Sequence, residues 1–225
     1  MFRNVKYVYP DISEPIRFLP GKVCSLVIEN QDLLRSIAED FHAQFSGGEG
    51  KGVLSDDNSI LRTDKYMEVI SGYVPFEINR KPLLSKLYAA LEKTALDAEH
   101  YIATQELLVL IEKSIYEWAY NTDCDLSCDN ISVSSVIKAS GVVFSEDKTD
   151  TLGKIIDYME NVRQLDCEKI FVFFLLRSYF SDRKVKLFLK NVLDKDFTVL
   201  LIDNVEQTKF DFEARLTVDK DLCLI

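Results

Sequence analysis

Three carboxylates gather in a short polar break of the sequence. Residues 121–130 read Asn-Thr-Asp-Cys-Asp-Leu-Ser-Cys-Asp-Asn, and this composition is typical of a bend between helices. Calcium accepts roughly six to eight hard oxygen ligands from carboxylates, carbonyls and water. Asp123, Asp125 and Asp129 are therefore candidate calcium ligands. The alternative is a solvated acidic turn that caps the following helix.

Two familiar metal-binding patterns do not fit this segment. As an EF-hand loop that begins at Asp123, it has Cys128 in place of the required glycine and Ser134 in place of the bidentate glutamate. As a zinc site, Cys124 and Cys128 lack a second pair of cysteines or histidines that would complete four ligands. Neither an EF-hand nor a zinc site is predicted.

A second candidate is a stripe of cations on a helix expected late in the chain. Arg183, Lys186 and Lys190 recur at spacings of three and four residues, opposite an apolar face. Such a stripe can follow the phosphates of a nucleic acid, and it is also what the solvated face of an amphipathic helix contains. The dispersed cations, of which Lys51 and Lys138 are retained as DNA-binding candidates, are Lys51, Lys65, Arg80, Lys81, Lys138 and Lys154.

A nucleotide site would require a phosphate-binding loop between a strand and a helix. The candidate, residues 47–52, has Phe45 where the first glycine belongs and Gly52 where Ser or Thr would hold magnesium. It also follows an expected helix, whereas a phosphate loop precedes one. Asp203 ends an apolar run as a metal-binding acid would, but strands commonly end on Asp. Nucleotide hydrolysis is therefore not predicted.

Nucleophilic catalysis has no recognisable residues either. The two histidines, His42 and His100, lie in no Ser or Cys motif. We predict that the protein is not an enzyme.

The elements that position these residues begin with residues 167–204. Two continuously apolar, β-rich runs there flank an amphipathic helix, as in a βαβ unit whose parallel strands are buried on both faces. A second strand-then-helix unit is expected at 23–45, with Asn30 as the helix cap and Gly47-Gly48 as the stop. The fold class predicted is α/β with a parallel-rich sheet.

Apolar residues at three- and four-residue steps from Lys81 to Tyr120 predict two long helices that form an antiparallel hairpin. We expect an α/β head from residues 1–80 and 140–225, and an inserted helical leg from 81–139. The alternation at Val5, Tyr7 and Tyr9, followed by prolines near 14–16 and 20–21, suggests edge strands joined by a turn. The smaller expectations are a mobile loop at 46–59, strands at 60–61, 66–78 and 141–144, helices at 133–139 and 152–162, and two strands around an exposed stretch 213–221 in the tail.

Composition limits the possible partners. The chain has 225 residues, a formal net charge of −10 and five scattered cysteines, which fits a reducing compartment. No apolar run is long enough to span a bilayer and the start lacks a signal peptide, so a soluble, cytoplasmic protein is expected. An acidic protein that binds nucleic acid must concentrate its cations on one face or recruit metal ions.

The order of elements resembles a known family, the Csn-two accessory proteins of type II-A CRISPR systems, which act in antiviral defence by acquiring new spacers. The resemblance covers nearly the full length, and no single motif is diagnostic. The matching segments are Glu14-Pro15-Ile16 with Gly21, the strand Leu26-Val-Ile-Glu29, Asp125-Leu-x-x-Asp129-x-Ile131, Val136-Ile-Lys-x-x-Gly141-Val142, Lys169-Ile-Phe-Val and Thr198-Val-Leu-Leu-Ile.

The resemblance implies a head similar to P-loop ATPases without the nucleotide site, and a helical leg. It also implies a ring of four subunits, with double-stranded DNA ends held in the hole without sequence preference. Calcium would bind near the junction of leg and head, with Asp125 and Asp129 as ligands. A further acidic ligand of the family would fall near Ser134 or Ser135, so calcium binding here is expected to differ.

The leading hypothesis is a non-enzymatic, calcium-stabilised homotetrameric ring that binds DNA ends, with the spacer integrase and the RNA-guided effector nuclease of the same system as partners. Two alternatives from other classes remain open. One is a degenerate nucleotide-dependent enzyme on the same head. The other is a scaffold that docks the spacer-acquisition proteins through its acidic surface.

Overall fold

The computed structural model describes the chain except for residues 1–3, 58, 123–125, 128–129 and 149. Its internal contacts divide the chain into two compact units. The first unit is Met1–Phe76 with Lys148–Ile225, and the second is Glu77–Asp147.

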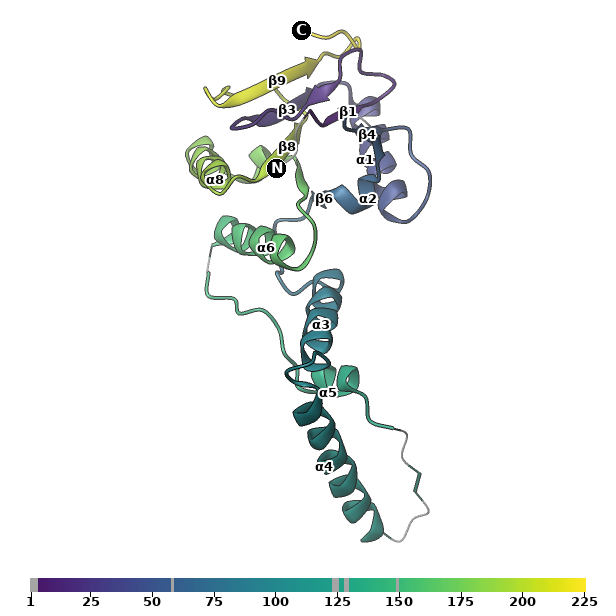
Figure 1. Ribbon diagram of the computed structural model, residues 1–225. Helices are drawn as coiled ribbons and strands as arrows, with labels where there is room; N and C mark the ends of the chain where they lie inside the picture. The colour runs from purple at the N-terminus through teal and green to yellow at the C-terminus, as the bar shows by residue number, and fades with distance from the viewer. Residues whose placement is uncertain (1–3, 58, 123–125, 128–129, 149) are drawn as a thin grey trace. The chain divides into compact units, whose positions relative to one another are not determined.

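A parallel five-stranded sheet forms the centre of the first unit (Figure 1). Its spatial order is β6-β7-β8-β3-β9, with every neighbouring pair parallel. The strands are β3 (Val23–Ile28), β6 (Met67–Ile70), β7 (Ile170–Phe174), β8 (Thr198–Asp203) and β9 (Glu213–Val218). All residues of β3 and β7 are buried, which explains why their sequences are continuously apolar instead of alternating. The predicted α/β class and the βαβ unit are confirmed.

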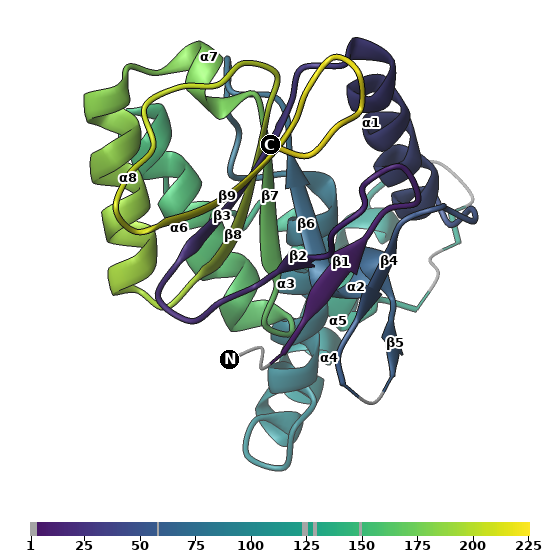
Figure 2. The ribbon, with the colours of Figure 1, turned by 90° about the horizontal axis from the view of Figure 1, so that it is seen from above.

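The connections between these strands cover the sheet on both faces (Figure 2). Helix α1 (Gln31–Phe45) lies on one face, and α6 (Thr151–Leu165) and α8 (Asp182–Asp194) lie on the other. A short helix, α7 (Leu176–Tyr179), precedes α8. Asn30 caps α1 as predicted, because its Oδ1 accepts a hydrogen bond of 2.9 Å from the amide of Leu33. Residues 204–212 connect β8 to β9 without a helix.

A small antiparallel sheet packs beside α1 in the order β2-β1-β4-β5, followed by the single-turn helix α2 (Thr63–Tyr66). Its strands are β1 (Lys6–Val8), β2 (Ile16–Arg17), β4 (Val53–Ser55) and β5 (Ile60–Leu61). The mobile loop predicted for residues 46–59 is therefore wrong over β4. The buried carboxylate of Asp40 accepts hydrogen bonds from the amides of Lys51 and Gly52, which holds this segment in place.

Three further strand predictions are wrong. The strand expected at 66–78 is only β6, since Gly72 and Pro75 interrupt it and proline cannot donate to a ladder. Residues 141–144 form no strand, because the Phe144 amide donates instead to Asn79 Oδ1 at 2.9 Å. The tail holds one buried strand, β9, and Glu213, predicted to be exposed, is 4% exposed.

The second unit contains α3 (Lys81–Ala95), α4 (Tyr101–Tyr120) and α5 (Val133–Ala139). The two long helices are confirmed, but the antiparallel hairpin is wrong, because α3 packs against α5 and not along α4. Thr104 Oγ1 donates to the carbonyl of Ala95 at 2.7 Å, and Asp97 accepts from the His100 amide at 2.9 Å. These bonds fix the direction in which α4 leaves α3. No residue of α4 is buried.

A substitution at Gly52 would test how tightly the small sheet packs against α1. A Cβ at Gly52 would lie 1.9 Å from Tyr7 Oη, and Tyr7 cannot retreat because it is buried and stacked on Phe41 at 5.3 Å. We expect Gly52→Ala to lower the free energy of unfolding by roughly 1–3 kcal/mol, the usual cost of overpacking. Gly72→Ala is the matched control, since a Cβ there meets nothing within 4 Å. Chemical denaturation measures both, and equal stability of the two variants would contradict the prediction.

Candidate functional site

The cationic stripe lies on α8 as predicted. Arg183, Lys186 and Lys190 are exposed, whereas the opposite side of the helix is buried against the sheet. The buried residues are Val185, Phe188, Leu189 and Val192. Phe188 meets Phe173 of β7 edge to face, with ring centroids 5.5 Å apart. Packing of the apolar face therefore sets which way the cations point.

The cations of α8 have no acidic partners in the described part of the chain. Arg183, Lys184, Lys186 and Lys190 form no ion pair there, and Lys186 Nζ lies above the Phe210 ring at 5.7 Å. Some other surface cations of this acidic protein are paired, as Arg62 is with Asp64 and Arg35 is with Asp32. The α8 stripe is thus a local concentration of positive charge that an anionic partner can reach.

The two other predicted DNA-binding residues are not part of this stripe. Lys51 is exposed in the loop between α1 and β4. Lys138 is exposed in the last turn of α5 in the second unit, where a cation also stabilises the helix dipole. The structure brings together Arg183, Lys186 and Lys190 alone, and the DNA-binding roles of all five remain predictions.

A buried ionic cluster, which the sequence did not reveal, lies on the α8 face of the sheet. Arg177 of α7 places Nη2 2.8 Å from Glu213 Oε2 and Nε 3.8 Å from Asp203 Oδ2. Arg215 of β9 places Nη2 2.8 Å from Glu213 Oε1. All four side chains are at least 95% buried. In the sequence, the cluster is indicated only by the positions of these four charged residues, which lie within or next to apolar segments.

Burial and charge act on this cluster in opposite directions. Burial raises the pKa of Asp203 to about 6, although the guanidinium of Arg177 opposes the shift. Burial also raises the pKa of Glu213, but the Phe210 amide and the guanidiniums of Arg215 and Arg177 together bring it below its ordinary value. Glu213 is therefore a fixed anion, whereas Asp203 is the member of the cluster that titrates closest to neutral pH.

The β3–α1 turn, where a phosphate loop would lie, is short and is capped by its own side chain. The turn from β3 to α1 consists of Glu29 and Asn30, and the Asn30 side chain already occupies the first turn of the helix. The glycine-rich loop lies at the other end of α1, where its amides bind Asp40 instead of a phosphate. Asp203 faces Arg177. These contacts agree with the mismatch between residues 47–52 and a phosphate loop, and the lack of enzymatic activity stays a prediction.

The three predicted calcium ligands, Asp123, Asp125 and Asp129, lie outside the described residues. Among the residues that are described, no three His, Cys, Asp or Glu side chains gather as a potential metal site. Ser135, near the position of a further family ligand, is engaged in a capping box with Ser132 at the start of α5. The calcium prediction thus depends on the donor chemistry of the acidic bend, whose carboxylates are suitable hard ligands.

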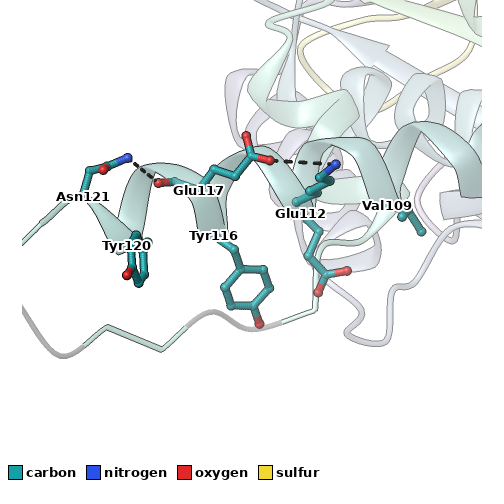
Figure 3. Close-up of a pocket in the computed structure, with 7 residues that line it drawn as sticks. Val109, Glu112, Tyr116, Glu117, Tyr120 and Asn121 are labelled. Atoms are coloured by element: carbon teal, nitrogen blue, oxygen red, sulfur yellow. Dashed lines mark hydrogen bonds and ion pairs between the residues drawn. The ribbon is translucent and has the colours of Figure 1, made fainter.

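Helix α4 exposes a row of apolar and aromatic side chains. Val109, Tyr116 and Tyr120 point to the same side of the helix, together with Glu112 (Figure 3). Ile102 precedes them by one heptad and is 72% exposed, and Tyr120 is 90% exposed. No described helix is both long and apolar enough to cross a membrane.

Glu213 and Glu206 both contact Arg215, but only Glu213 is buried, so the stability costs of substituting them can be compared. Glu213→Gln would leave two buried guanidiniums without their shared anion, and we expect a loss of about 3–5 kcal/mol in the free energy of unfolding. Glu206, which lies 3.5 Å from Arg215 but has a 58% exposed side chain, is the control. We expect Glu206→Gln to cost less than about 1 kcal/mol. Urea denaturation of both variants decides, and a small effect at Glu213 would mean that the cluster is weakly coupled.

The family model described as CRISPR-associated protein (Cas_Csn2) matches residues 44–222, which include the whole second unit and every strand of the large sheet except β3. No curated protein matches the chain. The matched segment is most of the 225 residues and contains both α4 and the α8 stripe. The chain therefore belongs to the CRISPR-associated Cas_Csn2 family.

Proposed function

We propose that this family member is a non-enzymatic protein that binds ends of double-stranded DNA during the acquisition of new CRISPR spacers. The observation that carries the proposal is the cation stripe of α8, whose members are exposed and unpaired within the described chain, in an otherwise acidic protein. Because such a stripe contacts phosphates and not base edges, binding is expected to show little sequence preference.

Because the chain has a net negative charge, the position of its cations decides where DNA could bind. Four chains would carry 4 × −10 = −40 formally, so DNA could enter a ring only along a surface where positive side chains face it. The association should weaken steeply with salt, because counterions released from DNA supply much of its free energy.

Neutralising the stripe tests this assignment. In a variant with Arg183, Lys186 and Lys190 changed to Gln, we expect affinity for linear duplex DNA to fall about tenfold or more. The slope of log K against log salt should become shallower by about 0.9 for each phosphate that the variant no longer binds. Fluorescence anisotropy at several salt concentrations measures both quantities.

The control variant changes Arg35, Arg62 and Lys93 to Gln, which alters the net charge equally. Arg35 and Arg62 are already paired with carboxylates, and none of the three lies on α8. An equal fall in affinity in the two variants would reject the stripe as the contact surface. Equal binding of linear and covalently closed circular DNA would reject the recognition of ends.

We further propose that the protein assembles into a homotetrameric ring, with α4 as one of its contact elements. An isolated helix that is apolar around most of its circumference is normally covered, and no residue of α4 is buried within the single chain. A second copy would cover the row formed by Ile102, Val109 and Tyr116.

Two isoleucines of similar exposure test the role of α4. Ile102 on α4 is 72% exposed and Ile60 on β5 is 78% exposed. We expect Ile102→Glu to shift the mass measured by light scattering to a smaller species, because a charge would be buried at the contact. Ile60→Glu should leave the mass unchanged. An unaltered assembly in Ile102→Glu would exclude this part of α4 from the interface.

Calcium is the proposed cofactor, with Asp125, Asp129 and Asp123 as candidate ligands. Bound there, it would neutralise the carboxylates of the acidic bend and restrict the chain between α4 and α5. Changing Asp125 and Asp129 to Ala should abolish calcium binding by calorimetry and loosen the assembly. Asp147→Ala, another acid of the second unit, is the control. Unchanged calcium affinity in the double variant would refute the ligand assignment.

The first unit is proposed to be a degenerate P-loop-ATPase-like head. Its support is an all-parallel sheet covered by helices on both faces, joined to a β3–α1 turn that has no phosphate loop. The rival enzyme hypothesis requires ATP to raise the melting temperature or to be hydrolysed. The rival scaffold hypothesis, with the spacer integrase and the effector nuclease as partners, requires association that survives nuclease treatment.

A further inference from the structure

The connection between β8 and β9, residues 204–212, is called the strap here. It joins β8 to β9, which lie on either side of β3 in the sheet, without the helix that usually fills such a crossover, and most of its residues are exposed. Figure 2 shows it running along the α8 side of the sheet. Phe210 is the buried apolar residue of the strap, so most of the connection is held by specific polar contacts.

Arginines supply two of the main contacts of the strap. Arg177 Nη1 donates to the Thr208 carbonyl at 2.9 Å, and Arg215 Nη1 donates to the Gln207 carbonyl at 2.6 Å. Glu213 Oε2 accepts from the Phe210 amide at 3.1 Å. The Phe210 ring also lies 4.7 Å from the Arg177 guanidinium carbon. The strap is thus fastened to the buried ionic cluster.

Asp203 is the unsatisfied member of that cluster. It is the last residue of β8, directly before the strap, and its side chain is 4% exposed. Neither of its carboxylate oxygens has a hydrogen-bond partner in the described structure, and neither does Arg177 Nε, 3.8 Å away. A buried, ionised carboxylate without hydrogen bonds is costly, and either a proton or access of water would relieve that cost.

We propose that the strap is a proton-dependent latch, in which closure of the strap and protonation of Asp203 favour each other. A closed strap keeps water from Asp203 and so favours its neutral form. Opening the strap would hydrate the carboxylate and favour the ionised form. By linkage, whatever holds the proton on Asp203 also holds the strap closed.

The titratable groups around Asp203 come from α7, from β9 and from the segment after β6. Arg177 faces it from α7, Glu213 and Arg215 act on it from β9, and Tyr73 lies near it after β6. Burial, with the nearby Asp203 and Tyr179, raises the pKa of Tyr73, which therefore stays neutral. The pKa of Glu213 is lowered, so it stays ionised at and above weakly acidic pH. Asp203 is then the group in this cluster whose charge changes near neutrality.

The sign follows from the raised pKa of Asp203, about 6 in the closed state. Its ordinary value of about 3.9 applies once the strap opens and the carboxylate is hydrated. The stabilisation of the closed state is therefore complete below about pH 4 and is lost as pH rises through about 6. Between about pH 5.5 and pH 7.5 the closed-to-open ratio should fall roughly fourfold.

Hydrogen–deuterium exchange of the full-length protein tests the latch. Protection of the strap amides, corrected for intrinsic exchange, should fall about fourfold from about pH 5.5 to about pH 7.5. In Asp203→Asn, which is always neutral and nearly the same size, the protection should not depend on pH. Asp211→Asn, an exposed position in the strap, should retain the wild-type dependence.

Amides of β7 serve as an internal reference for global opening. A pH-dependent change in the strap that β7 shows equally would arise from unfolding of the whole unit, and the latch would be rejected. Wild-type protection that is constant with pH, or an equal dependence in Asp203→Asn, would also overturn the proposal. The test does not involve DNA, calcium or assembly, so its outcome is separate from that of the proposed function.

Discussion

Removal of the central strands from water on both faces is the constraint on which the first unit depends. β3 and β7 are buried at every residue, so helices must cover both faces of the sheet. α1 covers one face, and α6 and α8 cover the other. α8 is apolar where it covers the sheet and polar where it faces water. Fold stability and the display of cations thus come from one amphipathic helix.

The same requirement explains the buried charges. Where the chain crosses from β8 to β9 it forms no helix, and the space above β9 is filled by Arg177, Arg215 and Glu213 instead. Their hydrogen bonds hold a strap that has little apolar surface to bury. The arrangement leaves Asp203 enclosed but without hydrogen bonds from the described residues. The buried charged cluster that replaces a helix here therefore encloses Asp203, a carboxylate that can bind a proton.

The second unit has the opposite character. α3 and α5 pack together, whereas α4 has no buried residue although much of its surface is apolar. The periodicity of residues 101–120 identified a helix with a face to bury, and the predicted partner was the neighbouring helix in sequence. Periodicity shows that a helix has an apolar face to bury, but it does not show which surface that face packs against. The hairpin was wrong for that reason.

Elements with strong local signals could be predicted from the residues alone. Continuous apolar runs identified β7 and β8, Asn30 marked the start of α1, and three- and four-residue spacing revealed the α8 stripe. The partners of isolated polar residues emerged only once the chain was folded. Asp40 binds amides eleven and twelve residues away, and Glu213 meets Arg177 across 36 positions. Such pairs depend on how distant segments are brought together, and no local pattern of residue types records that distance.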